Sequence, residues 1–287
     1  MQAMWKEILT PYNQEKYSFE KEISQENNPN ANARLWIQPN NTVLKVYSVW
    51  NNQTKSNNDM LQEICRVKQL FSMREIAMPL QILFENNVII GFTMPYYTGI
   101  HLDDYLSNPL IPSESKLHCL IKLAEIINAM PKDVFIGDLH GKNILVESND
   151  NIHIIDIDGF SIKGHEQTCP LKAFSARKDI LGQRKYHHFD GSLKISRDTD
   201  IFCFFIFFLE WIMGGINFMA YTRNEINEYL DYIGDKGFPR EIKLMINRLF
   251  DRKHNYIEPN VFESINLSLI GYYSYPAYVK SQELSSW

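Results

Sequence analysis

Three polar residues in the middle of the chain have the types and the spacing that phosphoryl transfer requires. Asp138 and Asn143 lie five positions apart, and Asp156 follows thirteen positions after Asn143. Phosphoryl transfer needs a carboxylate to hold the acceptor hydroxyl, metal ligands for the phosphates and fixed positive charge. The hard oxygens of Asp and Asn side chains suit Mg²⁺, which shares its coordination shell with phosphate. The spacing therefore predicts a magnesium-dependent phosphotransferase site.

Two short strands must position these residues. The run Ile144–Glu147 follows Asn143 directly, and the run Ile152–Ile157 carries Asp156. Residues Asn149–Asn151 separate the two runs, and such a polar cluster is typical of a turn. We therefore expect a hairpin that brings the loop and Asp156 around one metal site.

The rest of the chain divides into a strand-rich part and a helical part. In the first part the expected strands are Arg34–Gln38, Thr42–Trp50, Leu80–Phe84 and Val88–Met94, with a helix over residues 60–71. After Tyr97, helices are expected over 101–107 and 115–130, the latter capped by Ser113 or Ser115, and the chain is mostly helical from Asp200 onward. The pattern predicts an α+β protein.

Composition excludes several classes of protein. The 287 residues are 45% hydrophobic and 22% charged, which is typical of a folded domain rather than a disordered chain. A net charge of −5 argues against a nucleic-acid-binding protein. The four cysteines form no CxxC pair, so neither a zinc site nor a disulfide framework is expected, and a reduced, cytoplasmic setting is favoured.

One apolar run is long enough to resemble a membrane span. Ile201–Met219 is almost entirely apolar, but Glu210 lies in its middle and Gly214 and Gly215 follow soon after. A charge at that depth in a membrane is costly. We therefore predict a buried central helix and no membrane span.

The runs Gly137–Leu145 and Ile154–Phe160 together resemble the catalytic loop and the metal-binding segment of the protein-kinase-like superfamily. The resemblance implies a two-lobed α+β fold, with an extension at 1–17, a β-rich N-lobe at 18–97 and a helical C-lobe at 98–287. It also implies ATP as a substrate and Mg²⁺ as a cofactor. On this resemblance Asp138 is the catalytic base, Asn143 and Asp156 are metal ligands, and Leu145 lies under the adenine ring.

Residues elsewhere in the chain match other positions of the family. Lys45, in the run Val43–Val46, resembles the strand lysine that contacts the α- and β-phosphates, with Val43 beside the nucleotide. Glu63 on the expected helix is its implied partner. Met94 resembles the gatekeeper residue, and backbone groups around Tyr96 would bind adenine.

Asp200 and the residues around Asp138 complete the comparison. Asp200 resembles the aspartate that opens the central helix of the larger lobe and braces the catalytic loop. Ile136 and Gly137 replace the His-Arg pair of most protein kinases, which argues against activation by a phosphorylated loop. His140 replaces a frequent lysine, as in many small-molecule kinases, and Lys142 is a candidate to supply the missing charge.

Two further departures affect the nucleotide site. The segment Ser24–Trp36, where the family has a glycine-rich loop over the phosphates, contains no glycine. Asp158 makes the metal segment read Asp-x-Asp-Gly-Phe, as in a branch of bacterial kinase-like proteins, and is either a further metal ligand or a structural residue.

Several functions stay open at this point. A Ser/Thr protein is favoured as the acceptor over a small molecule. A nucleotide-binding pseudokinase, transfer of a nucleotidyl group, and a haloacid-dehalogenase-like phosphatase with Asp156 as nucleophile are the alternatives. The aromatic tail Tyr272–Tyr278 either packs on the helical part or binds a partner.

Overall fold

The computed structural model describes ten segments of the chain, and the account below concerns these residues. They are 9–23, 33–47, 73–86, 88–137, 139–148, 151–157, 160–162, 196–214, 223–250 and 256–274. Several predicted features lie outside these segments: Glu63, Asp138, Asp158, most of the glycine-free loop Ser24–Trp36, and the tail after Ser274. The chain forms two compact units, one with Met1–Thr98 and His153–Asp158, the other with Gly99–Ile152 and Gly159–Trp287.

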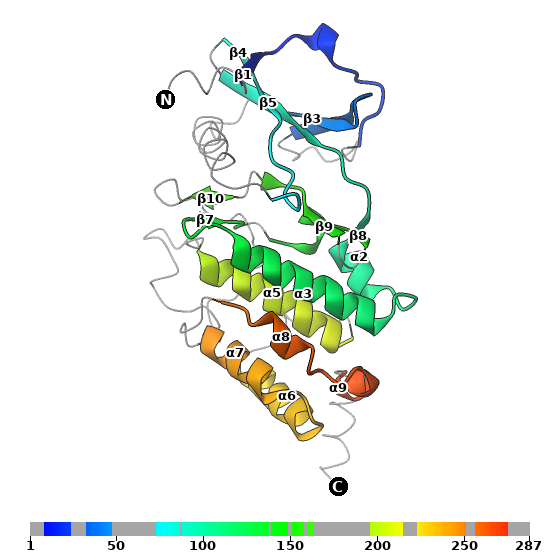
Figure 1. The fold of residues 1–287 in the computed structure, drawn as a ribbon, viewed down its shortest axis with the longest axis vertical. Helices are drawn as coiled ribbons and strands as arrows, with labels where there is room; N and C mark the ends of the chain where they lie inside the picture. Colours follow the sequence, from blue (N-terminus) through cyan, green and yellow to red (C-terminus); the bar gives the residue numbers. More distant parts are fainter. Residues whose placement is uncertain are drawn as a thin grey trace. The chain divides into compact units, whose positions relative to one another are not determined.

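The first unit is built on a five-stranded sheet in the order β1-β4-β5-β3-β2 (Figure 1). Its strands are β1 (Leu9–Pro11), β2 (Ala33–Ile37), β3 (Thr42–Tyr47), β4 (Gln81–Glu85) and β5 (Val88–Pro95). All neighbouring pairs are antiparallel except β1 and β4, which are parallel. The four strands predicted for this part of the chain are confirmed, within one residue at each described end.

Asparagine forms the turns between these strands. Asn41, between β2 and β3, has φ 59°, and Asn86, between β4 and β5, has φ 49°. Asn adopts this left-handed conformation more readily than most residues. Both hairpins of this sheet therefore turn at an asparagine.

The segment before β2 covers one face of the sheet. Trp36, Leu44 and Leu83 are buried on that face, and aromatic residues of the N-terminal segment (Tyr12, Tyr17 and Phe19) pack against them. The Tyr12 N–H donates to the Phe84 carbonyl (2.9 Å), and β1 pairs with β4, so that β1 and not β4 lies at this edge of the sheet. Part of the expected extension at 1–17 is thus an integral piece of the sheet.

The second unit contains two small sheets and most of the helices. Its helices are α2 (Leu102–Ser107), α3 (Ser113–Ala129), α5 (Arg197–Ile212), α6 (Arg223–Asp235), α7 (Arg240–Phe250), α8 (Pro259–Phe262) and α9 (Ile270–Tyr273). One sheet has the order β6-β8-β9, from β6 (Ile100–His101), β8 (Ile144–Ser148) and β9 (Asn151–Ile154), and the other pairs β7 (Val134–Phe135) with β10 (Ser161–Ile162). The α+β class is therefore confirmed.

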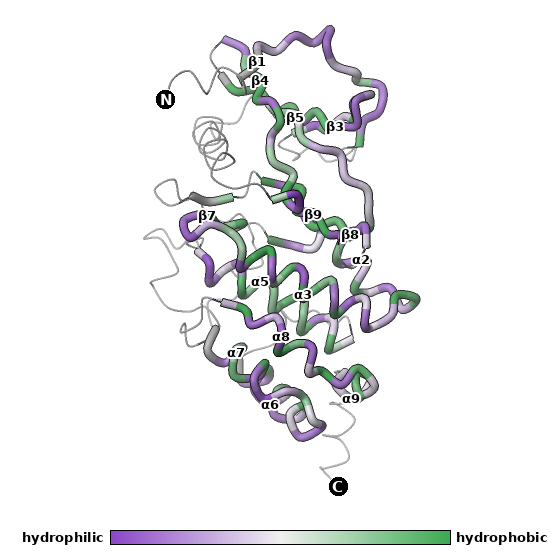
Figure 2. Tube along the Cα trace, viewed as in Figure 1, coloured by the Kyte–Doolittle hydropathy of each residue, from purple (hydrophilic) through white to green (hydrophobic). Residues whose placement is uncertain are grey.

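The core of the second unit is formed around α5. Every residue from Thr199 to Leu209 is buried, and Phe204, Phe205 and Phe208 pack on Phe262 of α8. Apolar residues recur along α3 and α5, which contact each other (Figure 2). The prediction of a buried central helix is confirmed, and no described helix is long and apolar enough to cross a membrane.

Two details differ from the expectations. α3 begins at Ser113 with Pro112 in the N-cap position, and no side chain caps the helix, so the predicted serine cap is wrong. Proline fits there because it has no N–H that would need a partner. β9 ends at Ile154, so Asp156 lies two residues beyond the strand that was expected to carry it.

In the C-terminal segment, Tyr273 is buried against Phe238.

Candidate active site

Lys45 lies on the face of the sheet opposite the N-terminal segment. Side chains alternate along a strand, so Leu44 and Lys45 point to different faces. In the register of β3 and β5, Lys45 is opposite Phe92 and Val43 is opposite Met94. Val43, Lys45, Phe92 and Met94 therefore share one face, and all four are buried.

Lys45 forms an ion pair with Asp156, which is 111 positions away in the sequence. The Lys45 Nζ donates a hydrogen bond to Asp156 Oδ1 at 3.0 Å. The Lys45 side chain is 10% exposed, whereas that of Asp156 is 38% exposed. A buried ammonium is stable only when it is paired, and the aromatic rings of Phe92 (5.7 Å) and Tyr47 (5.9 Å) also lie near it. The Asp156 side chain thus stays partly accessible to solvent while it is paired with Lys45.

Backbone hydrogen bonds hold the segment that carries Asp156. The Ile154 N–H donates to the Glu75 carbonyl (2.7 Å), and the Ala77 N–H donates to the Ile154 carbonyl (2.8 Å). These bonds form a parallel bridge between Ile76 and Ile154. Ile157, directly after Asp156, is fully buried. Asp156 is thus anchored on both sides within the first unit.

Aromatic stacking adds a second anchor to this segment. The Tyr97 ring stacks on His153 with centroids 3.7 Å apart and an interplanar angle of 9°. The Tyr97 hydroxyl donates to the Arg74 carbonyl at 3.0 Å. The stack ties the residues after β5 to the chain that leads to Asp156.

The Tyr96 N–H, in the segment predicted to bind adenine, has a backbone partner in this structure. Met94 is buried at the end of β5, next to the predicted adenine-binding segment. The Tyr96 N–H donates to the Asn41 carbonyl at 3.2 Å. The turn before β3 therefore uses this donor, and binding of adenine by backbone groups around Tyr96 stays a prediction.

The second unit carries the predicted catalytic loop. Asp138 itself lies outside the described residues, and its neighbours Gly137 and Leu139 are buried. The loop continues into a 3-10 turn, Gly141–Asn143, in which Asn143 is buried and Lys142 is exposed. Leu145 follows in β8 and is partly buried.

Asp200 holds the backbone immediately before position 138. Its Oδ2 accepts the Ile136 N–H and its Oδ1 accepts the Gly137 N–H, both at 2.9 Å. The carboxyl is completely buried, and this burial raises its pKa to about 6, although the two N–H donors and Arg197 act to lower it. Asp200 thus lies where the resemblance placed a bracing aspartate.

Gly137 has a conformation that other residues rarely adopt. Its φ is 74°, in the left-handed region. Only glycine enters this region without a steric cost. This geometry gives a physical reason for glycine at the position where most protein kinases have arginine.

Arg197, which no sequence motif identified, binds the backbone that precedes the two residues held by Asp200. Its guanidinium donates to the carbonyls of Ile127, Met130 (2.9 Å), Pro131 (3.0 Å) and Val134 (3.3 Å). The carbonyls of Met130 and Pro131 lie between the end of α3 and the start of β7, and that of Val134 belongs to the first residue of β7. The first turn of α5 therefore forms hydrogen bonds with residues 127–134 through Arg197 and with residues 136–137 through Asp200. The only sign of this role in the sequence is the position of Arg197, three residues before Asp200 and at the start of the run that forms the buried helix.

The predicted site residues are divided between the two units. Val43, Lys45, Met94, Tyr96 and Asp156 belong to the first unit, and Lys142, Asn143, Leu145 and position 138 belong to the second. Within the described residues, no three His, Cys, Asp or Glu side chains form a metal-binding group. The pairing expected for Lys45 with Glu63 lies outside the described residues, and the pairing with Asp156 was not predicted.

The chain was also compared with known proteins. No protein-family model and no curated protein matched it.

Proposed function

We propose that this chain is an ATP-dependent phosphotransferase with a two-lobed protein-kinase-like fold. Among such enzymes, a cytoplasmic Ser/Thr protein kinase is favoured over a small-molecule kinase. The observation that carries the proposal is the Lys45–Asp156 pair at 3.0 Å. A strand lysine and a carboxylate more than a hundred positions apart are the two groups that the reaction needs next to the phosphates and the metal. The sequence motifs predicted a role for each of the two residues independently of this contact.

The Asp200 contacts support the same proposal independently. A buried carboxylate that accepts two consecutive N–H groups fixes the backbone directly before Asp138. A catalytic base acts only when its oxygen is within reach of the acceptor hydroxyl. Asp200 is therefore a positioning residue for Asp138.

The residues present suit Mg²⁺ and ATP. Asp156 and Asn143 offer hard oxygen ligands, and the Asp156 carboxylate remains 38% exposed while paired with Lys45. The metal supplies charge neutralisation at the phosphates. In the proposed reaction Lys45 holds the phosphates, Asp138 orients the acceptor hydroxyl and accepts its proton, and Lys142 adds positive charge. The oxygen of the acceptor then forms a bond to the γ-phosphorus, and ADP leaves.

The phosphatase alternative is less well supported. It places Asp156 at the end of a strand in a doubly wound parallel sheet. Among the described strands, the five-stranded sheet is antiparallel apart from the β1–β4 pair, and Asp156 follows a short strand of a three-stranded sheet.

The test is incubation of the purified chain with Mg²⁺ and ATP labelled at the γ-phosphate, with and without a generic protein acceptor. Label on protein is expected for the wild type and not for Asp138→Ala. Asp156→Ala should lose the Mg²⁺ dependence of nucleotide binding in a thermal-shift measurement. Asp235→Asn, an exposed carboxylate at the end of α6, is the matched control and should behave as the wild type.

The outcomes separate the alternatives. Label on added metabolites but not on protein would identify a small-molecule kinase. Nucleotide binding without transfer would identify a pseudokinase, and transfer of label in a parallel incubation with ATP labelled at the α-phosphate would identify nucleotidyl transfer. The absence of both transfer and nucleotide binding would refute the proposal.

A further inference from the structure

The first turn of α2 lies over the 3-10 turn that carries Asn143. β6 pairs with β8, with His101 opposite Leu145. α2 starts directly after His101, and the 3-10 turn ends directly before β8. The strand register therefore brings α2 against Gly141–Asn143, and the two elements are in contact.

The Asp103 carboxylate fills the space that a side chain at position 141 would occupy. A Cβ added to Gly141 would lie 1.6 Å from Asp103 Oδ1 and 2.2 Å from Asp103 Cγ. Real Cβ atoms do not approach so closely, so the carboxylate can lie there only because residue 141 is glycine. Gly141 is buried, although much of the Asp103 residue is exposed. The contact is made by the carboxylate end of the side chain.

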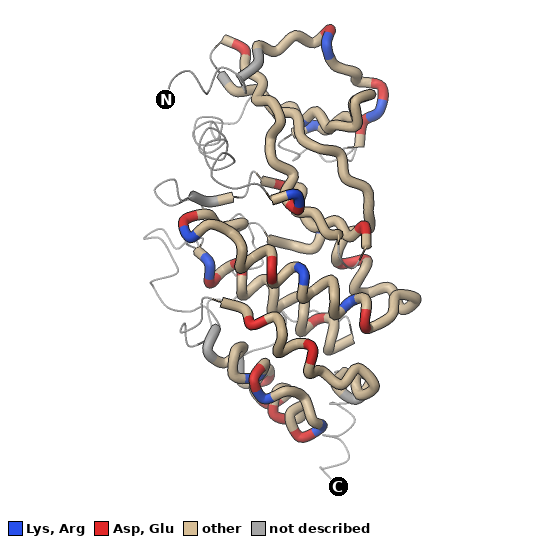
Figure 3. The backbone as a smooth tube through the Cα atoms, in the orientation of Figure 1, with Lys and Arg blue, Asp and Glu red and all other residues tan. Residues whose placement is uncertain are grey.

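The charges around this contact favour it. Burial raises the pKa of the Asp103 carboxyl and Asp104 adds to this rise, whereas His140 and Lys142, on either side of Gly141, and also His101 act to lower it. Acidic residues occupy the first turn of α2, as Figure 3 shows. Asp103 therefore interacts electrostatically with two loop residues as well as packing on the glycine between them.

We propose that Asp103 is a positioning residue of the catalytic loop. It holds the turn Gly141–Asn143, and with it the Asn143 amide and the Lys142 side chain, in the arrangement that phosphoryl transfer requires. Its kinetic consequence rests on the proposed function, and its structural consequence does not. Asp103 touches no reacting group itself.

The kinetic test compares variants of both partners. Asp103→Asn keeps the shape of the side chain, Asp103→Ala removes the contact, and Gly141→Ala inserts a methyl group into it. Each should lower kcat, by roughly 10- to 100-fold for Asp103→Ala and Gly141→Ala, because a misplacement of about 1 Å is enough for such a loss. The KM for ATP should change by less than about twofold, since nucleotide binding is not the step affected.

Two further variants make the test specific. Asp104→Asn removes a neighbouring acid from the same turn and should leave kcat unchanged. The double variant Asp103→Ala/Gly141→Ala has room for the added methyl group. It should lose no more activity than either single variant, because the two changes remove the same contact. Additive losses, or an equal effect of Asp104→Asn, would overturn the inference.

Hydrogen exchange decides the structural part even if the chain transfers no phosphoryl group. Peptides covering residues 139–146 should exchange their amide hydrogens roughly fivefold faster in Asp103→Ala than in the wild type or Asp104→Asn. Asp103→Asn should lie between the two. Unchanged exchange in both Asp103 variants would show that this side chain does not hold the turn, whatever the activity of the protein.

Discussion

Replacing Asp200 with Asn is the most direct test of how the buried carboxylate acts on the loop before Asp138. The change removes one charge from the interior and keeps the shape of the side chain. The remaining amide oxygen can still accept one of the two N–H groups, from Ile136 or Gly137, whereas the new NH₂ group faces the other. Because an amide does not ionise in this pH range, the variant does not titrate at this site, whereas the wild-type carboxyl does.

The pKa of Asp200 sets the size and sign of the effect. The pKa in the folded protein is about 6, raised from 3.8. Between pH 4 and pH 6 the folded state binds more protons at this site than the unfolded state, so the contribution of Asp200 to stability falls as the pH rises. At 1.36 kcal/mol for each pKa unit, the full change is about 3 kcal/mol. The contribution is complete below pH 4 and is lost above pH 6.

Urea unfolding of both proteins at several pH values measures this effect. The free energy of unfolding of the wild type minus that of Asp200→Asn should decrease by about 3 kcal/mol from pH 4 to pH 7. The subtraction cancels every titrating group that the two proteins share. A difference that is constant across this range, or that increases with pH, would refute the account of Asp200 as a carboxyl destabilised by burial.

Three other substitutions test the supports of the site. Gly137→Ala should destabilise the fold by about 1–2 kcal/mol, because its φ of 74° is strained for alanine. Gly234→Ala in α6, where a Cβ meets no neighbour, should instead stabilise the fold by about 0.5–1 kcal/mol. Thermal unfolding of the two variants measures both effects. Arg197→Ala should cost about 2–4 kcal/mol in urea unfolding because it removes the donors to four carbonyls, and a smaller loss than that of Gly137→Ala would argue against this role. Lys45→Met should change stability by no more than about 1 kcal/mol because Asp156 is partly exposed, yet lower phosphoryl transfer at least ~100-fold, and retained transfer would exclude Lys45 from the reaction.

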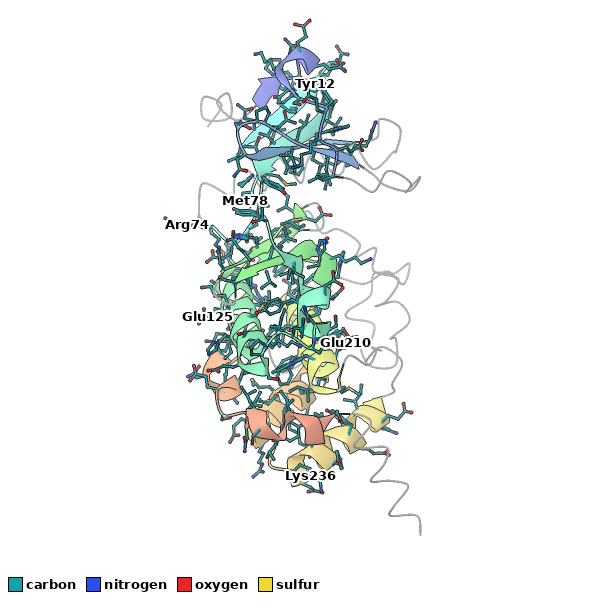
Figure 4. All side chains as sticks on the ribbon, turned by 90° about the vertical axis from the view of Figure 1, so that its right-hand side faces the viewer. Tyr12, Arg74, Met78, Glu125, Glu210 and Lys236 are labelled. Atoms are coloured by element: carbon teal, nitrogen blue, oxygen red, sulfur yellow. The ribbon has the colours of Figure 1, made fainter. Side chains whose placement is uncertain are left out.

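Local features of the fold were predictable from the sequence. The β-branched and aromatic residues of Thr42–Tyr47 identified a strand because strand propensity is a property of adjacent residues. The buried helix α5 was identified from its apolar run, even though Glu210 interrupts it. Figure 4 shows this residue toward the end of that helix. The strand β1 was missed, because three residues that pair in parallel with a distant strand have no local signature.

The candidate site was only partly predictable. Motif spacing predicted that Asp138, Asn143 and Asp156 serve one reaction, and the family resemblance added Lys45. It predicted Glu63 as the partner of Lys45, and it did not predict the contact with Asp156. The hydrogen bond that uses the Tyr96 N–H was also missed, since its acceptor, Asn41, lies far away in the sequence.

The sequence by itself determined which residue types are present, their spacing, and the periodicity that forms β3, α3 and α5. Only the tertiary structure decided which of these residues meet. Sheet register places Lys45 on one face, burial of α5 brings Asp200 to two backbone N–H groups, and the β6–β8 pairing brings Asp103 to Gly141. Such contacts depend on the packing of segments that are far apart in the chain, and no local pattern encodes that packing.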